Sequence, residues 1–241
     1  MIVRYRFFAD AAEAIPPGRA YAFYSCLLSM LPYEYGELLH DQGDTPVSQF
    51  LYYDKEKREN VWQITVFGAD AAEVFCPVLD ELGELELNSG TVGLRLREKL
   101  RYSAAEFIAS ARSHPVDRWE TLYFLSPTAF KQSGRYAFLP QEHLIINSLL
   151  SKWNAAFSEY PLDDEDAVIL LENGIHVSDY MLRSVRFPLK DNRIPGFKGS
   201  VTFEARLAPP IMEIWNLLVH FACFSGVGIK TALGMGGVMR V

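Results

Sequence analysis

The order in which strand-like and helix-like segments alternate constrains this fold more than any single motif does. Successive side chains of a strand point to opposite faces, whereas a helix repeats about every 3.6 residues, so the spacing of apolar residues distinguishes the two. In the first half the predicted order is strand, helix, strand, strand, helix, strand. The predicted helices span residues 19–31 and 70–82, the second with Asp70 as its N-cap. The predicted strands span residues 2–8, 47–53 and 61–67, and the last strand position is filled by two short strands, 85–87 and 92–100.

The second half repeats this order. Its predicted segments are a strand at 119–125, a helix at 141–160, strands at 175–187 and 198–207 around a Pro/Gly loop, a helix at 210–224 and a strand at 236–241. The β-α-β-β-α-β order is that of a ferredoxin-like domain. Residues 102–118 show no strong period and contain Pro115, so the boundary is expected there. The sequence thus predicts an α+β fold of two tandem ferredoxin-like domains, residues 1–115 and 116–241.

Cysteine and histidine usage argues against a metal centre. Cys26, Cys76 and Cys223 lie far apart, which excludes a zinc ribbon and a disulfide scaffold and favours a reducing, cytoplasmic setting. The five histidines form no HxxxH pair, so neither a metal nor a cofactor is predicted. His114 is expected to be solvated and His220 to pack at the edge of the core. The longest apolar stretch, 211–229, is interrupted by polar residues, so no membrane span is expected.

Charge is unevenly distributed along the chain. With 23 Lys and Arg against 30 Asp and Glu, the net charge is −7, which taken alone argues against a nucleic-acid partner. Residues 176–241, however, hold eight basic and four acidic residues, a net charge of +4 that leaves −11 on residues 1–175. A local basic face can hold a polyanion whatever the net charge of the chain. Nucleic-acid binding is therefore expected on one face only.

A glycine-rich segment near the C-terminus is the most informative motif. Five glycines fall between residues 226 and 237, together with Lys230 and Thr231. A P-loop is excluded because Ile229 separates Gly228 from Lys230, and a Rossmann fingerprint is excluded because too few residues follow. Two interpretations remain open. The segment is either a helix C-cap followed by a tight turn, or a loop whose backbone amides and Lys230 contact phosphate.

The order of residues in this segment resembles a known family signature. Gly226, Gly228, Lys230, Thr231, Gly234 and Gly236, after an apolar helix and before a closing strand, resemble the C-terminal signature of the CRISPR-associated endoribonucleases that process repeat RNA. Those enzymes belong to a superfamily built on RNA-recognition-like domains. The segments 124–130 and 196–199 and the pair Leu139-Pro140 are similar to other parts of the family pattern. The resemblance covers most of the second half by sequence and the first half by architecture.

The resemblance implies an activity and a set of catalytic residues. It implies a metal-independent endoribonuclease that cuts a CRISPR repeat by acid-base catalysis and leaves a 2′,3′-cyclic phosphate. His40, at the end of a helical turn predicted at 33–40, matches the position of the family's catalytic histidine, and the alternative is a histidine stabilised by a helix C-terminus. Tyr24 or Tyr21 of the first helix would assist it, and both could equally be core residues. The family's downstream lysine is absent, since residues 45–48 are Thr-Pro-Val-Ser.

The resemblance also implies the partners. CRISPR repeat RNA is the expected ligand, while association with other CRISPR effector subunits and homodimerisation are left open. Two alternatives remain: a catalytically weak or inactive RNA-binding subunit of an effector complex, and a small-molecule-binding protein whose glycine loop holds an anion. The residues expected to contact RNA are Gly226, Gly228, Lys230, Thr231, Gly234, Gly236, Arg183 and Arg186.

Overall fold

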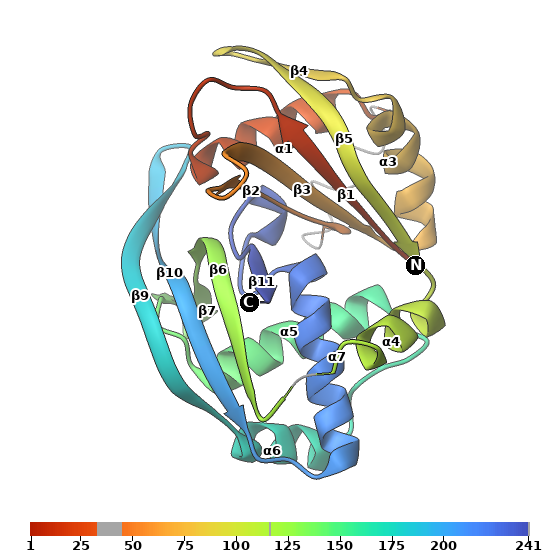
Figure 1. The fold of residues 1–241 in the computed structure, drawn as a ribbon, viewed down its shortest axis with the longest axis vertical. Helices are drawn as coiled ribbons and strands as arrows, with labels where there is room; N and C mark the ends of the chain where they lie inside the picture. The colour runs from red at the N-terminus through yellow and green to blue at the C-terminus, as the bar shows by residue number, and fades with distance from the viewer. Residues whose placement is uncertain (33–44, 116, 241) are drawn as a thin grey trace.

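The structure is a computed structural model that describes residues 1–32, 45–115 and 117–240 (Figure 1). The helical turn predicted at 33–40, which includes His40, lies outside the described residues. Figure 1 shows two sheets with helices packed against each, one sheet built from the first half of the chain and one from the second.

The first half forms an antiparallel sheet in the order β2-β3-β1-β5-β4. Alternation along β1 explains its two faces, because Val3, Tyr5 and Phe7 are buried against the helices whereas Arg4 and Arg6 lie on the other face. The strand order and the two helices confirm the first ferredoxin-like unit. Its elements are β1 (Ile2–Ala9), η1 (Pro17–Arg19), α1 (Ala20–Ser29), β2 (Val47–Asp54), β3 (Glu59–Phe67), α3 (Ala69–Glu81), β4 (Glu84–Leu87) and β5 (Gly90–Tyr102).

The second half forms a sheet in the order β11-β6-β10-β9, which is the same ferredoxin-like arrangement. With the first unit, it confirms the predicted fold class. A short β7–β8 hairpin and the helix α6 are additions to the plan. The elements are β6 (Trp119–Thr128), β7 (Phe130–Gln132), β8 (Arg135–Ala137), α5 (Glu142–Ala156), α6 (Glu165–Gly174), β9 (Ile175–Leu189), β10 (Asn192–Ala205), α7 (Pro209–Ser225), η2 (Thr231–Leu233) and β11 (Val238–Arg240).

Three expectations about local structure are wrong. The stretch 102–118 contains a helix, α4 (Ala104–Arg112), which begins with a capping box between Ser103 and Glu106. The N-cap of α3 is Gly68 rather than Asp70, which lies in the first turn. The Pro/Gly loop expected between the long strands is part of β10, and the turn comes earlier, at 190–191. The domain boundary after residue 115 stays a prediction, although α4 packs into the second core through Phe107.

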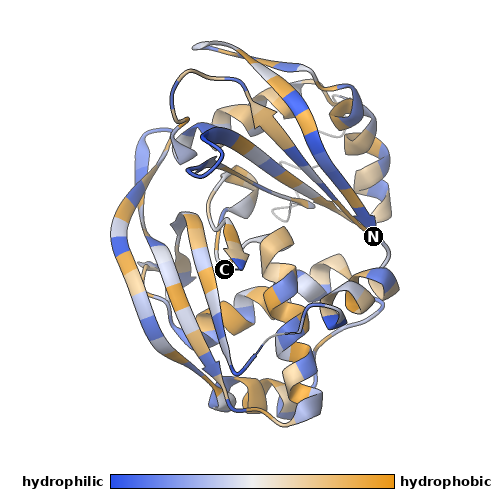
Figure 2. Ribbon diagram, in the orientation of Figure 1, coloured by the Kyte–Doolittle hydropathy of each residue, from blue (hydrophilic) through white to orange (hydrophobic). Residues whose placement is uncertain are grey.

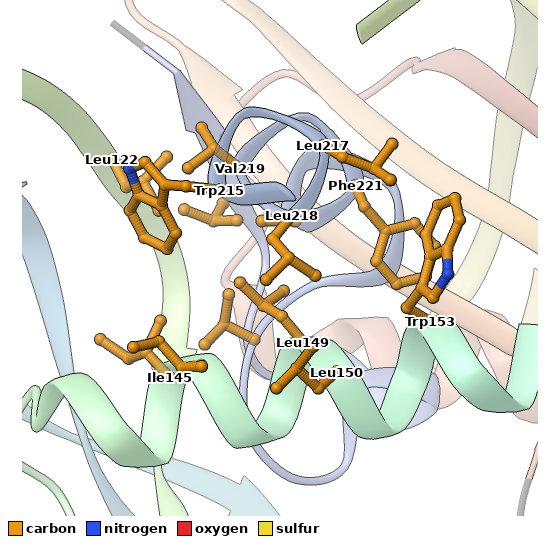
Figure 3. Close-up of a cluster of buried hydrophobic side chains, with 14 of the residues drawn as sticks. Leu122, Ile145, Leu149, Leu150, Trp153, Trp215, Leu217, Leu218, Val219 and Phe221 are labelled. Atoms are coloured by element: carbon orange, nitrogen blue, oxygen red, sulfur yellow. The ribbon is translucent and has the colours of Figure 1, made fainter. Parts of the chain in front are cut away.

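Helix α7 joins the two halves. Leu218 and Phe221 on α7 face Leu149 and Trp153 on α5 within the second core (Figure 3). On its other side α7 meets the first sheet, where Phe67 and Phe221 pack edge to face with ring centroids 5.9 Å apart. Figure 2 shows that α7 is apolar over most of its length. A helix buried on several sides needs such a sequence, so the apolar stretch is a core helix, as predicted.

Candidate functional site

The glycine loop, residues 226–237, leads from α7 to β11. Gly226 is the C-cap of α7 with a φ of 65°, as in the cap-and-turn interpretation. Nearly all of the loop is buried, and Lys230 is its exposed residue. Met235 packs with Ala129 and Ile194 of the second half, whereas Ala232 belongs to the core of the first half. The loop therefore lies between the two domains rather than on an open surface.

Close packing explains why the loop is built from glycine. A Cβ on Gly228 would lie 2.3 Å from the carbonyl oxygen of Ala129, and the φ of Gly228 is +82°. A Cβ on Gly237 would lie 2.2 Å from the ring of Phe50 on β2. Any larger residue must displace the backbone or the neighbouring domain. Gly237 thus allows the loop to approach the first half of the protein, and Gly228 allows it to approach Ala129 in the second half.

The backbone amides of the loop are largely engaged inside the protein. The N–H of Gly228 donates to Ser148 Oγ at 2.8 Å, and that of Gly237 donates to Ser126 Oγ at 2.7 Å. Those of Gly226, Val227, Ile229 and Gly236 donate to backbone carbonyls. These N–H groups already have acceptors within the protein. Contact between the loop residues and RNA phosphate stays a prediction.

Two ammonium groups accompany the loop. Lys230 is exposed and has a left-handed backbone with φ 56°. Lys152 on α5 donates from Nζ to Thr231 Oγ1 at 2.7 Å, so the buried Thr231 hydroxyl has a partner within the protein. Lys152 was missed because nothing in a helical sequence marks which lysine will face a loop about 80 residues away. Lys230, the exposed one of the two, is placed where it could contact an anion.

Gln49 holds the loop in place. Its buried Nε2 donates to the carbonyls of Ala20 and Ala232, both at 3.0 Å, and its Oε1 accepts from Trp62 Nε1 at 2.9 Å. One side chain thereby joins the first turn of α1, the glycine loop and β3. A buried amide with its donors and acceptor engaged is a rigid connection, since any displacement leaves a polar group unpaired.

Replacing Gln49 by leucine is therefore expected to destabilise the fold by about 2–4 kcal/mol, because two carbonyls and an indole N–H lose their partner. Urea unfolding measures this change. Gln132→Leu, on the exposed β7–β8 hairpin, is the matched control and should leave the unfolding midpoint nearly unchanged. Equal midpoints for the two variants would show that Gln49 does not anchor the loop.

The two candidate tyrosines of α1 differ in their surroundings. Tyr24 is 3% exposed and belongs to the first core. Tyr21 is half-buried at the start of α1, and Lys190 Nζ, from the turn between β9 and β10, lies 6.0 Å from its ring centroid. Tyr21 is thus the more accessible of the two and has a cation beside it. Both assignments stay predictions, and their placement relative to His40 lies outside the described residues.

Arg183 and Arg186 do not share a face. Both are exposed on β9, but only two residues lie between them, so they point to opposite sides of the strand. Arg183 pairs in register with Lys198 on β10. The pKa of Lys198 is lowered by burial and by the positive charges of Arg183 and Lys55. Lys55, Arg183 and Lys198 are therefore a basic cluster, to which the β2–β3 turn of the first domain contributes.

His220 is packed at the edge of the core, as predicted. Its ring lies 5.0 Å from that of Phe107 and stacks on exposed His114 at 6.2 Å. Burial, then the charges of Arg240, His114 and Arg4, lower the pKa of His220 to about 4. It is therefore neutral at physiological pH.

This pKa predicts an acid-dependent loss of stability. The folded state binds a proton at His220 less readily than the unfolded state does, so its contribution is complete above about pH 6.5 and is lost as the pH falls towards about 4. His220→Phe should flatten the fall in unfolding free energy over this window by up to about 2 kcal/mol, allowing for partial exposure. His176→Asn, at an exposed position on β9, should leave the slope unchanged. Urea unfolding at several pH values checks both.

Within residues 1–32, 45–115 and 117–240 no three His, Cys, Asp or Glu side chains are grouped so that they could hold a metal ion. The three cysteines are free. In that same part of the chain no helix is long and apolar enough to cross a membrane.

Comparison with known proteins places these features in a family context. The family model of the CRISPR-associated endoribonuclease Cas6 matches residues 122–238, which include most of β6, all of α7 and the glycine loop. A curated Cas6 endoribonuclease of Streptococcus thermophilus is 27% identical over 220 residues, 91% of this chain and 90% of that protein. One of Mycobacterium tuberculosis is 28% identical over 218 residues, 88% of this chain and 68% of that protein.

Solved structures agree with the sequence relatives. A Cas6 product complex is 26% identical with a TM-score of 0.77, over 100% of this chain and 99% of that one. A Cas6 structure of Thermus thermophilus is 25% identical with a TM-score of 0.72, over 100% and 97% of the two chains. The similarity therefore extends to both domains.

Proposed function

We propose that the chain, which is similar to Cas6 endoribonucleases over nearly its whole length, is a member of that family and cuts the repeat RNA of a CRISPR precursor transcript into guide RNAs without a metal ion. The observation that supports this most is the similarity of both domains, over the full chain, to a Cas6 product complex. The three free cysteines suit a cytoplasmic location.

The proposed reaction is an internal transfer at phosphorus. A base takes the proton of the 2′-hydroxyl, the 2′-oxygen bonds to the adjacent phosphorus, and the bond from phosphorus to the 5′-oxygen breaks. An acid protonates that 5′-oxygen, which leaves a 2′,3′-cyclic phosphate and a 5′-hydroxyl. His40 is proposed for one of these proton transfers, since imidazole serves as acid or base near neutral pH. Tyr21 or Tyr24 is proposed as the second catalytic residue, acting together with His40.

Charge around the glycine loop supports RNA as the ligand. Lys230 is exposed, Lys152 lies beside Thr231, and the basic cluster of Lys55, Arg183 and Lys198 adds three further cations. In the absence of cation neutralisation the phosphates of a bound RNA would repel one another and the acidic first domain. The loop glycines in this proposal set the position of Lys230 rather than bind phosphate themselves.

Lys230→Ala is expected to weaken repeat binding and to reduce the slope of log affinity against log salt by about 0.7–0.9, the loss of one phosphate contact. Filter binding across a salt series measures this slope. Lys99→Ala is the matched control, because Lys99 pairs with Asp80 at 2.6 Å and lies outside the proposed interface. An unchanged slope for Lys230→Ala would remove this lysine from the interface.

A direct assay separates the proposed function from its alternatives. Repeat RNA incubated with protein and EDTA should be cut once per repeat. Tight binding without cleavage would favour a non-catalytic RNA-binding subunit, and absence of salt-sensitive binding would favour a small-molecule ligand.

A further inference from the structure

The second sheet presents apolar side chains on the face that its helices leave uncovered. Leu122 and Phe124 of β6 are buried in the core, so the alternating residues Trp119 and Tyr123 point to the opposite face. Trp119 is 57% exposed and Tyr123 is 42% exposed. Aromatic rings of this size are usually buried, so two on one open face of a sheet are informative.

The register places these rings on one surface. Tyr123 is opposite Ser200, and Ser200 is opposite Met181 on β9, which is 80% exposed. Trp119 is four residues from Tyr123 along β6, about 13 Å at the usual rise of a strand. Between Trp119 and Tyr123 on this face lie the short side chains of Thr121 and its partner Thr202, whose hydroxyl groups are joined by a hydrogen bond of 2.9 Å. We call Trp119, Tyr123 and Met181 the open-face platform.

The charges around the platform favour a polyanion. The Arg118 guanidinium lies 4.8 Å from the centroid of the Trp119 ring. Glu204, which pairs with Trp119 across the strands, already forms salt bridges with Arg118 and Arg206. At the other end, the pair Lys198 and Arg183 lies two residues along the strands from the pair Ser200 and Met181. Asp179 is an exposed acidic residue on the same part of β9. Cations thus flank both ends of the platform.

We propose that the open-face platform binds unpaired nucleotides of single-stranded RNA, whose bases stack on Trp119 and Tyr123 while Arg118, Arg183 and Lys198 contact phosphate. The inference rests on the proposed function in taking RNA as the ligand, and it assigns to this sheet the part of the substrate that is not base-paired. An apolar patch meant for a second protein copy would not need cations at both ends.

The tryptophans provide a specific signal. Of the four in the chain, Trp62, Trp153 and Trp215 are at most 1% exposed, so Trp119 alone is accessible to a base. Titration with a single-stranded adenosine dodecamer should quench the solvent-accessible part of the tryptophan emission. Trp119→Ala should abolish this quenching and weaken binding of the dodecamer about five- to hundredfold, and Tyr123→Ala should weaken it by a similar factor. Trp119→Phe should retain most of the affinity.

Tyr180→Ala is the matched control, because Tyr180 is 66% exposed on β9 but pairs with the core residue Val201 and so lies on the other face. It should bind the dodecamer as the unmodified protein does. Unchanged dodecamer binding by Trp119→Ala and Tyr123→Ala would overturn the proposal. It would also be overturned if sedimentation showed that the unmodified protein self-associates, and that the two variants lose this self-association but keep their RNA affinity. Cleavage of repeat RNA in EDTA is scored separately. Dodecamer binding without cleavage contradicts only the proposed function, and cleavage without dodecamer binding contradicts only the platform.

Discussion

Gly228→Ala is expected to destabilise the protein by about 2–5 kcal/mol. A methyl group there would lie 2.3 Å from the Ala129 carbonyl oxygen, and this carbonyl is held in place because it accepts the N–H of Ile229 at 3.0 Å. The φ of +82° adds the cost of a left-handed backbone. Such a loss is a large fraction of the usual stability of a domain and should lower the Tm by about 5–15 °C in a thermal melt.

Two glycines elsewhere separate these contributions. Gly134 has a φ of +77°, and a Cβ there would have no neighbouring atom within 4 Å, so Gly134→Ala reports backbone strain alone. Gly83 has open space and no positive φ, so Gly83→Ala should be tolerated. The Tm is expected to fall in the order Gly83→Ala, Gly134→Ala, Gly228→Ala. If Gly228→Ala and Gly134→Ala had the same Tm, close packing would not be the reason for glycine at position 228.

His40→Ala is expected to reduce cleavage of repeat RNA about 10²- to 10⁴-fold, the usual contribution of a positioned acid or base. Binding of the repeat should change less than about twofold, because the proposed role of His40 is proton transfer. Single-turnover cleavage with excess protein and EDTA measures the first quantity, and filter binding measures the second. His143→Ala, at the start of α5, is the control and should cleave normally. Equal rates for His40→Ala and the unmodified protein would exclude His40 from catalysis.

Several strands could be predicted because polar and apolar residues alternate along them. In β1, Arg4 and Arg6 alternate with Val3, Tyr5 and Phe7, and the first part of β6 shows a similar contrast between buried and less buried positions. Strand order follows from the ferredoxin-like plan once the order of elements is known. These regularities are local, so a single sequence contains them.

Two helices were missed although their start signals are present. Ser103 and Glu106 form a capping box before Phe107, and the side chain of Asp164 caps α6 by accepting from the N–H of Ala167 at 2.8 Å. Both helices are short, and α6 begins within the acidic run at residues 163–166, which has no apolar period of its own. Short helices depend on packing as well as on their caps, so the sequence pattern is weak.

The long strand β10 shows why proline and glycine misled the prediction. Pro195 lies where β10 pairs with β9 but not yet with β6, whose pairing begins at Phe197, so its missing N–H costs no ladder hydrogen bond. Gly196 is needed because a Cβ there would lie 2.8 Å from the carbonyl oxygen of Thr128. Both residues usually mark a loop, and only the position of the neighbouring strand explains them here.

The candidate site depends on contacts that no local pattern reveals. Gln49 and Ala232 are 183 residues apart, yet one hydrogen bond joins them, and Tyr21 meets Lys190 from the other domain. The sequence therefore indicated which loop matters but not that its glycines serve the packing of two domains. Likewise it could not separate Tyr21 from Tyr24, because burial on a helix face is decided by the elements packed against it.

The most direct test of the account is the product of cleavage in the absence of metal. Repeat RNA labelled at its 5′ end is incubated with the protein in EDTA, and the new 3′ end is treated with phosphatase before and after acid opening of the ring. The account predicts a single cut per repeat whose 3′ end resists phosphatase until acid treatment, as a 2′,3′-cyclic phosphate does. Cleavage that requires added Mg²⁺ and leaves a 3′-hydroxyl would contradict it.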